Sequence, residues 1–394
     1  MPRILRIINR FNLGGPAYNV AYLTKYLAPE YETLLIGGEK EEHEESSGFI
    51  MNEMGIKPTI ILEMRRSINP INDYGAYLRI KKIIRDFKPD IVHTHAAKAG
   101  ALGRLAAISC KVPVIIHTFH GHVFNSYFGW FKTGIYKLVE RYLAKKSTVI
   151  IAISESQKYE LVNIYRICEE GKIKVIPLGF DLRKFRVNMP EKRAMFRKKY
   201  SLDDDEIAIG IIGRLVPIKN HNLFLKSIRY VKDNSSKKIR AFIIGDGEER
   251  KNIELEAKKL KIDFTDLENK KATLIFTSWI KDIDIAFSGM DIVALTSSNE
   301  GTPVSLIEAQ AAGKPIVTTR IGGVGDITIS NKTALWCENG NPEDYFNKLL
   351  SLIEKKDLRD ALSIEGPKHV ESVFHYEKLV KNMDELYKTF FSPR

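Results

Sequence analysis

The chain has 394 residues, of which 44% are hydrophobic, and this length and composition suit two globular domains. No stretch approaches the run of about 20 apolar residues that a membrane-spanning helix needs. The three cysteines, Cys110, Cys168 and Cys337, lie far apart without metal-ligand spacing, which favours a reducing, cytoplasmic compartment. The net charge is +12, of which residues 1–185 carry +9, so we expect an anionic partner for the first half: a membrane surface, a phosphorylated substrate or a nucleic acid.

Short apolar runs alternate with amphipathic stretches along the chain. The predicted strands are Ile4–Ile8, Thr33–Ile36, Ile91–His93, Val114–His117, Val149–Ile153, Ile173–Ile176, Ile207–Ile212, Ala241–Ile244, Thr273–Phe276, Asp291–Thr296 and Pro315–Thr318. Helical patterns between them include Tyr18–Leu27, Tyr77–Phe87, Lys219–Val231 and Glu248–Leu260. This order predicts an α/β fold with parallel sheets covered on both faces. So many strands predict two Rossmann-like domains, residues 1–188 and 189–373, followed by an amphipathic helix within residues 374–394.

A glycine pair follows the first predicted strand and precedes a helix. The segment Gly14-Gly15-Pro16 is consistent with a tight turn between the two elements, and also with a glycine loop that lines a ligand site. Ligands of parallel α/β sheets bind at the carboxyl ends of the strands, where this loop lies. Both interpretations remain open at this stage.

Three histidines, His117, His120 and His122, lie within six residues at the end of a predicted strand. Their spacing could suggest a metal site. We expect His117 to lie inside the strand, however, and no Asp, Glu or Cys is near in sequence, so no metal is predicted. A structural role in the loop remains an alternative for these histidines.

The segment Gly213–Lys219 follows the predicted strand Ile207–Ile212. A glycine at this point lets the backbone approach a ligand. Arg214 and Lys219 would bring two positive charges to a diphosphate, Arg by binding two oxygens and Lys as a point charge. The alternative is that both are solvated surface cations.

Three other acidic or glycine-containing motifs receive structural interpretations. Gly245-Asp246-Gly247 lacks the third glycine of a nicotinamide-binding fingerprint, so a tight turn is favoured. The run Asp203–Asp205 lies in a polar turn, and Asp282 with Asp284 is placed to cap a helix. None of them is predicted to hold a metal.

The segment from residue 299 to residue 323 carries two glutamates across a loop and the start of a helix. Thr302 can cap this helix and Pro303 suits its first position, so Glu300 lies on the loop and Glu308 in the first turns. The free N–H groups and the dipole of a helix N-terminus suit a phosphate. Two carboxylates beside such a site are well placed to accept hydrogen bonds from sugar hydroxyls.

An aromatic and basic helix is predicted over Phe128–Lys146. It interleaves apolar residues with Lys132, Lys137, Arg141, Lys145 and Lys146, as a membrane-surface helix would. We favour packing of its apolar face on the first domain, with the cations free to meet anionic lipid headgroups.

Six motifs follow one another along the chain: the glycine loop, Thr118-Phe119-His120-Gly121-His122, Ile153-Ser154-Glu155, Pro177-Leu178-Gly179-Phe180-Asp181, the Gly213–Lys219 motif and the paired glutamates. With these motifs in this order, the chain resembles the retaining glycosyltransferases of family 4. The resemblance covers nearly the whole chain. It implies the GT-B fold, in which two Rossmann-like domains face a cleft and the C-terminal helix crosses back to the first domain. It further implies that residues 1–188 bind the acceptor and residues 189–373 bind the nucleotide-sugar.

The resemblance also assigns roles to individual residues. His120, Arg214, Lys219 and Glu300 would be catalytic, and Gly15, Gly213, Thr302, Pro303, Val304 and Glu308 would bind the donor, with Glu308 on the ribose and Glu300 on the sugar. Gly14, Asn19 and His122 would lie on the acceptor side. The transfer would retain the anomeric configuration without a metal or another cofactor, since Arg214, Lys219 and backbone N–H groups would stabilise the departing diphosphate.

The expected activity is therefore transfer of a sugar from a nucleotide-sugar, with UDP the commonest base in the family, to a sugar or lipid-linked sugar in cell-surface polysaccharide or lipopolysaccharide synthesis. The expected location is cytoplasmic, with peripheral attachment to the inner face of the plasma membrane as a hypothesis. No nucleic-acid module is recognised, and no nucleic acid is expected as a partner. The alternatives are a nucleotide-sugar epimerase, a phosphorylase with the same fold, or a basic nucleic-acid-binding protein.

Overall fold

The computed structural model describes residues 1–12, 14–41, 46–65, 67–121, 130–268 and 270–391, with residues 130–132 described by their backbone alone. These residues form two compact units. Unit 1 is Met1–Phe180 together with Phe374–Arg394, and unit 2 is Asp181–Val373. The break after Phe180 precedes the predicted boundary at residue 188, because Phe185 is buried in unit 2 against Phe287, with ring centroids 5.7 Å apart.

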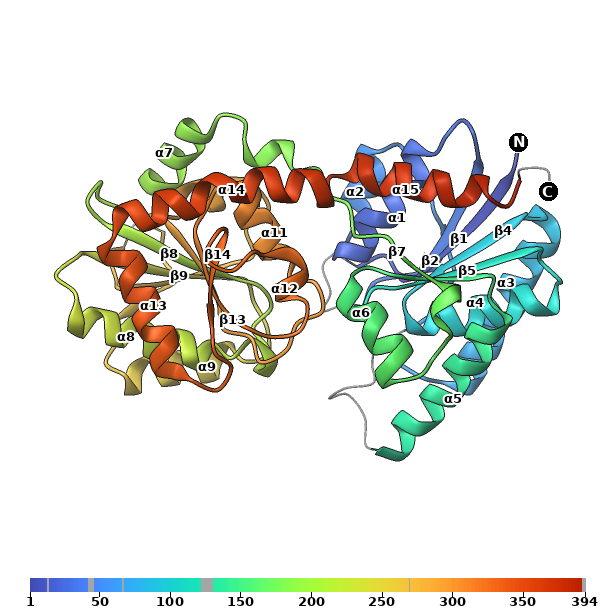
Figure 1. Cartoon of the computed structure of the whole chain (residues 1–394), viewed down its shortest axis with the longest axis horizontal. Coiled ribbons are helices and arrows are strands. Elements are labelled where there is room, and N and C mark those ends of the chain that lie inside the picture. Colours follow the sequence, from blue (N-terminus) through green and yellow to red (C-terminus); the bar gives the residue numbers. More distant parts are fainter. Residues whose placement is uncertain (13, 42–45, 66, 122–129, 269, 392–394) are drawn as a thin grey trace. The chain divides into compact units, whose positions relative to one another are not determined.

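Unit 1 is built on a parallel sheet with the strand order β3-β2-β1-β4-β5-β6-β7 (Figure 1). Its strands are β1 Arg3–Arg10, β2 Glu32–Gly38, β3 Thr59–Ile60, β4 Ile91–His95, β5 Val114–Phe119, β6 Val149–Ala152 and β7 Ile173–Val175. Its helices are α1 Gly15–Tyr26, α2 Gly48–Glu53, α3 Pro70–Phe87, α4 Ala97–Ser109, α5 Trp130–Lys146, α6 Glu155–Tyr159 and α15 Tyr376–Lys388, with a π-helical turn at Glu160–Ile164 and a 3-10 turn at Glu170–Lys172.

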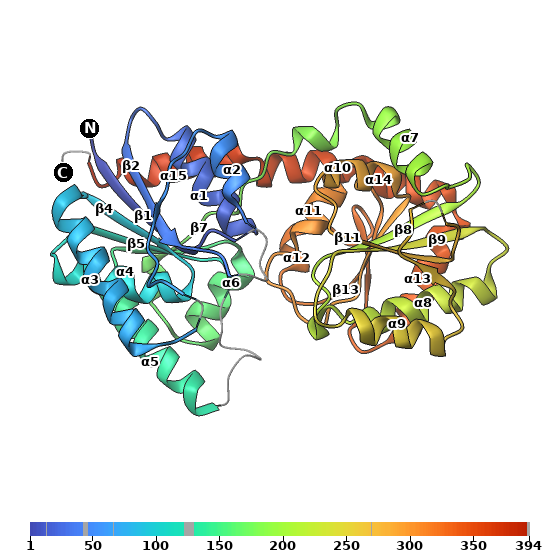
Figure 2. The same ribbon diagram turned by 180° about the vertical axis from the view of Figure 1, so that it is seen from behind.

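Alternate residues of the strands in unit 1 pack against helices on opposite faces of the sheet. Leu5 and Val92 lie in a core with α3 and α4, whereas Ile4 and Ile91 lie in a core with α1 and α15. Figure 2 shows the same layers from behind. The predicted C-terminal helix is thus part of unit 1, to which it contributes Leu379, Met383 and Tyr387.

Unit 2 repeats this plan with a parallel sheet in the order β10-β11-β9-β8-β12-β13-β14. Its strands are β8 Ile207–Ile212, β9 Ile239–Ile244, β10 Phe264–Thr265, β11 Leu274–Ser278, β12 Ile292–Leu295, β13 Ile316–Thr319 and β14 Ala334–Cys337. Its helices are α7 Met189–Lys199, α8 His221–Asn234, α9 Arg250–Lys259, α10 Ile283–Gly289, α11 Val304–Ala311, α12 Val324–Ile327, α13 Pro342–Glu354 and α14 Lys356–Phe374, with 3-10 turns at Arg183–Phe185 and Pro217–Lys219. The predicted α/β fold with two Rossmann-like domains is confirmed.

Some predicted element boundaries were wrong for identifiable reasons. The helix predicted from Tyr77 begins at Pro70, because the Asn69 side chain accepts hydrogen bonds from the N–H groups of Ile71 and Asn72 at 3.0 and 3.2 Å. The helix predicted from Lys219 begins at His221, since residues 217–219 form a tighter 3-10 turn. The strands β3, β10 and β14 were not predicted, and two of them have only two residues.

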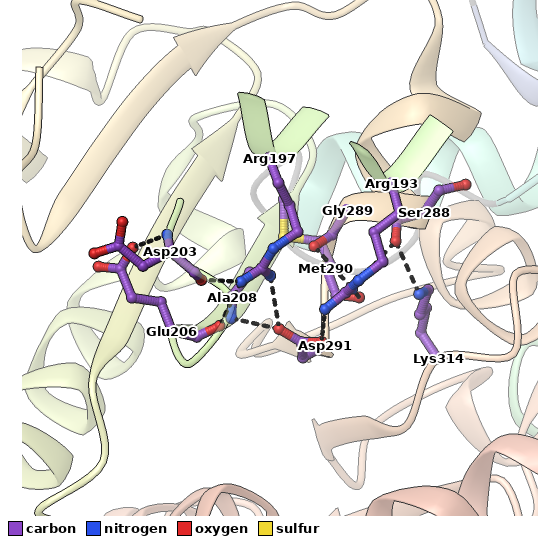
Figure 3. Close-up of polar contacts among 10 residues, drawn as sticks. All are labelled: Arg193, Arg197, Asp203, Glu206, Ala208, Ser288, Gly289, Met290, Asp291 and Lys314. Carbon is purple, nitrogen blue, oxygen red and sulfur yellow. Dashed lines mark hydrogen bonds and ion pairs between the residues drawn. The ribbon is translucent and has the colours of Figure 1, made fainter. Parts of the chain in front are cut away.

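A charged cluster fastens α7 to the amino ends of the strands in unit 2 (Figure 3). Arg193 and Arg197 donate to the carboxylate of Asp291 at 2.7 and 3.4 Å, and Asp291 also accepts from the N–H of Ala208 at 2.8 Å. Lys314 donates to the carbonyl of Ser288 at 3.1 Å, and burial, followed by the charge of Arg193, lowers the pKa of Lys314 to about 8. This cluster closes the end of the sheet opposite to the predicted ligand site.

Candidate active site

Two glycine turns meet at the carboxyl ends of β8 and β9 in unit 2. Gly213 has φ +152° and Gly245 has φ +137°, backbone conformations that residues with a side chain rarely adopt. A Cβ on Gly245 would lie 2.0 Å from the carbonyl oxygen of Gly213, so only glycine permits this contact. Gly245-Asp246-Gly247 therefore forms a tight turn, as predicted, and its backbone packs directly against the backbone of the Gly213 loop.

Lys219 and Glu300 form the charged centre of the site in unit 2. The Lys219 ammonium lies 2.5 Å from Oε1 of Glu300, and the hydroxyl of Ser297 donates to the same oxygen at 2.6 Å. The Lys219 side chain also passes beside Gly213: its Cε and Nζ lie 3.5 and 3.7 Å from where a Cβ on that glycine would be. The structure thus brings together Gly213, Lys219 and Glu300 from two separate motifs.

Two glycines that the sequence reasoning gave no role hold the Glu300 loop in place. A Cβ on Gly322 would lie 2.0 Å from the carbonyl oxygen of Glu300, and one on Gly323 would lie 1.7 Å from that of Gly301. The N–H of Gly323 also donates to the Glu300 carbonyl at 3.0 Å. The Gly-Gly pair in the loop after β13 was the available signal, since paired glycines near a strand end indicate close backbone contact.

The N-terminus of α11 presents unpaired backbone donors beside Glu300. The helix begins at Val304 with Pro303 as its N-cap, so the prediction that Thr302 caps the helix was wrong, since Pro303 occupies the cap and no side chain bonds there. Proline has no N–H group, so Pro303 cannot donate to a phosphate. Within the described part of the chain, the N–H groups of Thr302, Val304 and Ser305 have no backbone partner, which is the arrangement that binds anions.

Glu308 lies one turn into α11 and is partly buried. Burial raises the pKa of its carboxyl to about 7, which nearby Lys184 lowers and Asp284 raises to a smaller extent. No hydrogen bond or ion pair to this carboxylate occurs among the residues that the structure describes. A partly buried carboxylate without a partner is available to accept hydrogen bonds from a ligand.

Arg214 is exposed, and its guanidinium makes no ion pair or hydrogen bond within the described ranges. Its backbone is fixed nonetheless, because the next residue, Leu215, is fully buried and its N–H donates to the carbonyl of Asp246 at 3.0 Å. Arg214 therefore offers an exposed cation without a partner among the described residues, next to a backbone that is held by a hydrogen bond.

In unit 1, Gly14 is the N-cap of α1 and Gly15 is the first residue of this helix. Asn19 is 2% exposed. Its amide donates to the carbonyl of Gly15 at 3.0 Å and to that of Gly179 at 3.4 Å, and its oxygen accepts from the N–H of Gly179 at 3.2 Å. These contacts show Asn19 tying the Pro177–Asp181 segment to α1.

His120 follows β5 directly, and its Nε2 lies 2.9 Å from Nδ1 of His95. Burial lowers the pKa of His120 to about 4. The predicted partner His122 lies outside the described residues. His117 is inside β5, as predicted, where its Nδ1 lies 2.8 Å from the hydroxyl of Thr94.

The run Asp203–Asp205 lies on the surface as the sequence favoured, whereas Asp284 does not cap a helix: it lies in the first turn of α10 and pairs with Lys192 at 2.8 Å. Asp203 pairs with Lys271 at 2.7 Å and Asp205 pairs with Lys238 at 2.7 Å, both on the surface. Asp282 is the N-cap of α10, although its side chain makes no capping hydrogen bond. Over the described ranges, no group of three or more metal-ligating side chains occurs.

Two family models match consecutive parts of the chain. Residues 13–184 match Glycosyltransferase Family 4, and residues 192–369 match Glycosyl transferases group 1. Both parts of the chain match glycosyltransferase families, and the chain is a glycosyltransferase. This membership, and the neighbours described next, favour transfer over the epimerase alternative.

Individual glycosyltransferases are similar over most of their length. The Escherichia coli UDP-Gal:alpha-D-GlcNAc-diphosphoundecaprenol alpha-1,3-galactosyltransferase is 29% identical over 323 residues, 82% of this chain and 81% of that protein. The capsular polysaccharide biosynthesis glycosyltransferase CapM of Staphylococcus aureus is 26% identical, covering 84% of each chain. The crystal structure of Anabaena HepE with UDP superposes with a TM-score of 0.81 at 17% identity, covering 99% of this chain and 100% of that one, which establishes the GT-B fold.

Proposed function

We propose that this glycosyltransferase moves a sugar from a UDP-sugar to a lipid-linked sugar with retention of the anomeric configuration, in the synthesis of a cell-surface polysaccharide. The arrangement of Lys219, Glu300 and the unpaired N–H groups of α11 carries the proposal, because it joins cations, anion-binding donors and a hydroxyl acceptor in one place. The E. coli relative, which by its name uses UDP-Gal and a diphosphoundecaprenol acceptor, supports the choice of substrates.

Each residue of unit 2 then has a chemical task. Glu308 accepts hydrogen bonds from the ribose hydroxyls, and Glu300 accepts from hydroxyls of the transferred sugar. As the bond between the anomeric carbon and the diphosphate breaks, Arg214, Lys219 and the N–H groups of Thr302 and Val304 stabilise the negative charge that develops. Removing one such donor typically costs about 3 kcal/mol in the activation barrier.

The remaining steps involve unit 1. His120 contacts the transferred sugar, and Gly14 lies on the acceptor side. The acceptor hydroxyl forms its new bond on the face that the diphosphate leaves, and its proton passes to an oxygen of the departing phosphate. No metal is required by this account, since the cations and backbone donors of unit 2 compensate the diphosphate charge.

The test is transfer from UDP-Gal, UDP-Glc and UDP-GlcNAc to a synthetic polyprenyl-diphosphate-linked GlcNAc, followed by NMR of the product. We expect one donor to give an α-linked product, and Glu300→Gln to lower kcat/KM at least a hundredfold. Glu191→Gln, an exposed carboxylate of α7, is the control. A β-linked product would overturn retention. Interconversion of two UDP-sugars without acceptor would replace transfer by epimerisation.

The α5 surface, made of Ile135, Leu138, Val139, Tyr142, Lys145 and Lys146, supports peripheral attachment to an anionic membrane. The four apolar side chains are 41–63% exposed. The interpretation that the apolar residues of this helix pack on the domain therefore holds for Tyr136 and Leu143 but not for these four. The buried side of α5 instead carries Glu140, which pairs with Arg104 at 2.6 Å, and Leu143. Exposed apolar side chains beside two exposed lysines match a bilayer surface with anionic headgroups.

The contacts of the α5 cations decide which of them should be substituted to test this attachment. Arg141 donates to the carbonyls of Tyr165 and Arg166 at 2.9 Å, and Lys137 lies 5.0 Å from the ring centroid of Tyr165, so both cations are engaged within the unit. Lys145→Gln with Lys146→Gln should therefore weaken sedimentation with phosphatidylglycerol vesicles. The matched control is Lys251→Gln with Lys270→Gln, two exposed lysines of unit 2. Equal sedimentation of both double variants would reject the α5 surface.

Among the described helices, none carries an apolar stretch long enough to cross a bilayer. Attachment through the lysines of the α5 surface should weaken as the salt concentration rises, because surface charges are screened over about 10 Å at 0.1 M salt.

A further inference from the structure

Three buried hydroxyl side chains lie at the carboxyl ends of β12 and β13 in unit 2. Thr296 and Ser297 follow β12 directly, and Thr319 is the last residue of β13. Thr296 and Ser297 are fully buried, and Thr319 is 3% exposed. Buried hydroxyls need hydrogen-bond partners, so the choice of partner shows what each one does.

The hydroxyls of Thr296 and Thr319 bind backbone carbonyls. Thr296 donates to the carbonyl of Lys219 at 2.9 Å, which joins the end of β12 to the turn after β8. Thr319 donates to the carbonyl of Ser297 at 2.6 Å. Because β12 pairs with β8 on one side and with β13 on the other, these bonds hold the backbone around Ser297 to both neighbouring strands.

The hydroxyl of Ser297 binds a carboxylate instead. It donates to Oε1 of Glu300 at 2.6 Å, and Nζ of Lys219 lies 2.5 Å from the same oxygen. Glu300 forms an ion pair with Lys219, so its carboxylate is ionised and can only accept. The single proton of the Ser297 hydroxyl is therefore directed to Oε1, and two donors converge on one of the two oxygens of Glu300.

The second oxygen of Glu300, Oε2, remains available to a ligand. Within the described ranges, every hydrogen bond and ion pair of this side chain goes to Oε1. Oε2 does not belong to the buried polar atoms that lack a partner, so it is accessible to solvent. The side chain as a whole is only 12% exposed, and Oε2 is thus the acceptor that it presents from a largely enclosed position.

We propose that Ser297 is a positioning residue for Glu300: with Lys219 it holds Oε1, so that Oε2 meets a hydroxyl of the transferred sugar. This inference rests on the proposed function, in which Glu300 binds that sugar. An ammonium on a flexible four-carbon chain attracts a carboxylate without fixing its rotation. The Ser297 hydroxyl supplies the missing direction, because it is short and its backbone is held to two strands.

Calorimetric titration of the full chain with two ligands tests the proposal. UDP lacks the sugar, and the second ligand is whichever of UDP-Gal, UDP-Glc and UDP-GlcNAc binds the wild type most tightly. Ser297→Ala should lower the affinity for the UDP-sugar about tenfold, the order expected for one hydrogen bond to a charged group. It should change the affinity for UDP less than twofold. A merely structural role of Ser297 would weaken both ligands equally.

A double-mutant cycle shows whether Ser297 acts through Glu300. In the Glu300→Ala background, Ser297→Ala should change the affinity for the UDP-sugar less than twofold. The matched control is Ser227→Ala, since the Ser227 hydroxyl is also fully buried but donates to the carbonyl of Phe224 within α8 at 2.7 Å. This control should bind both ligands as the wild type does. If Ser297→Ala does not fold, Ser297→Cys, whose thiol is a weak donor, replaces it.

The outcomes separate the positioning role from the proposed function. Equal losses of affinity for UDP and the UDP-sugar in Ser297→Ala would overturn the positioning role, and so would a tenfold loss that persists in the Glu300→Ala background. An unchanged affinity of Ser297→Ala for the UDP-sugar, while Glu300→Ala weakens it, would also overturn the positioning role and leave the proposed function standing. If Glu300→Ala binds the UDP-sugar as the wild type does, the sugar contact in the proposed function is wrong, and the role of Ser297 falls with it.

Discussion

Replacing Glu308 by glutamine should stabilise the free protein at alkaline pH and weaken nucleotide binding. The pKa of this carboxyl is raised to about 7 from about 4.5, chiefly by burial. Each pKa unit corresponds to about 1.4 kcal/mol, so ionised Glu308 costs the folded state roughly 3 kcal/mol as an upper estimate. Because the folded state holds this proton more tightly than the unfolded state, the penalty is absent below pH 4.5, grows as the pH rises and is complete above pH 7.

The assay is urea unfolding of the wild type and Glu308→Gln at pH 5 and pH 8. We expect closely similar stabilities at pH 5 and an advantage of about 2–3 kcal/mol for the variant at pH 8. Glu191→Gln, on the surface, should change stability by less than about 0.5 kcal/mol at either pH. A variant that is no more stable than the wild type at pH 8 would refute the burial argument.

Ionised Glu308 lowers the stability of the free protein but should raise its affinity for UDP. Only the ionised carboxylate accepts from both ribose hydroxyls, and at pH 6 about one-tenth of Glu308 is ionised. The affinity of the wild type for UDP should therefore fall about tenfold between pH 8 and pH 6, and Glu308→Gln should bind weakly without this dependence. Equal wild-type affinities at both pH values would remove Glu308 from the ribose site.

Three further substitutions test the backbone contacts, ion pairs and hydrogen bonds that hold loops and helices of the two units in place. Gly323→Ala places a Cβ 1.7 Å from the Gly301 carbonyl, so it should cost about 1–3 kcal/mol and lower nucleotide affinity, whereas Gly325→Ala, with its nearest contact at 3.6 Å, should be close to neutral in thermal unfolding. Asp291→Asn leaves two arginines without their carboxylate and should lower the stability of unit 2 by about 2–3 kcal/mol in urea. Asn19→Ala removes three hydrogen bonds to buried backbone and should destabilise unit 1 by about 1–3 kcal/mol, without changing the affinity for UDP measured by calorimetry.

The sequence was sufficient for the fold because both sheets are built from long buried strands separated by amphipathic helices. β8 was predicted to the residue, since Ile207–Ile212 is an apolar run that contains one glycine, Gly210, and is followed by another, Gly213. The two-residue strands β3 and β10 were missed, because they are defined only by hydrogen bonds to strands that already exist. The start of α3 was missed because its first turn carries exposed Ile71 and Tyr74, which break the apolar periodicity.

The parts of the site that lie within one sequence motif could be predicted. The contacts between distant segments could not. The ion pair between Lys219 and Glu300 joins residues 81 positions apart, and only the fold shows it. The raised pKa of Glu308 comes chiefly from burial, which depends on tertiary packing that no local pattern reveals. His93 of β4 contacts Arg6 of β1, Thr118 of β5 and Tyr387 of α15. These contacts depend on strand pairings and side-chain hydrogen bonds that the sequence does not show.

The most direct test of the donor site is calorimetric titration of UDP, GDP and ADP into the wild type and Lys219→Met. The account predicts that UDP binds the wild type most tightly and that Lys219→Met weakens its affinity at least tenfold, through loss of a charge-assisted contact. Lys226→Met, an exposed lysine of α8, should bind UDP as the wild type does. Absence of binding by every nucleotide, or an affinity for UDP that is the same in Lys219→Met, would contradict the proposed donor site.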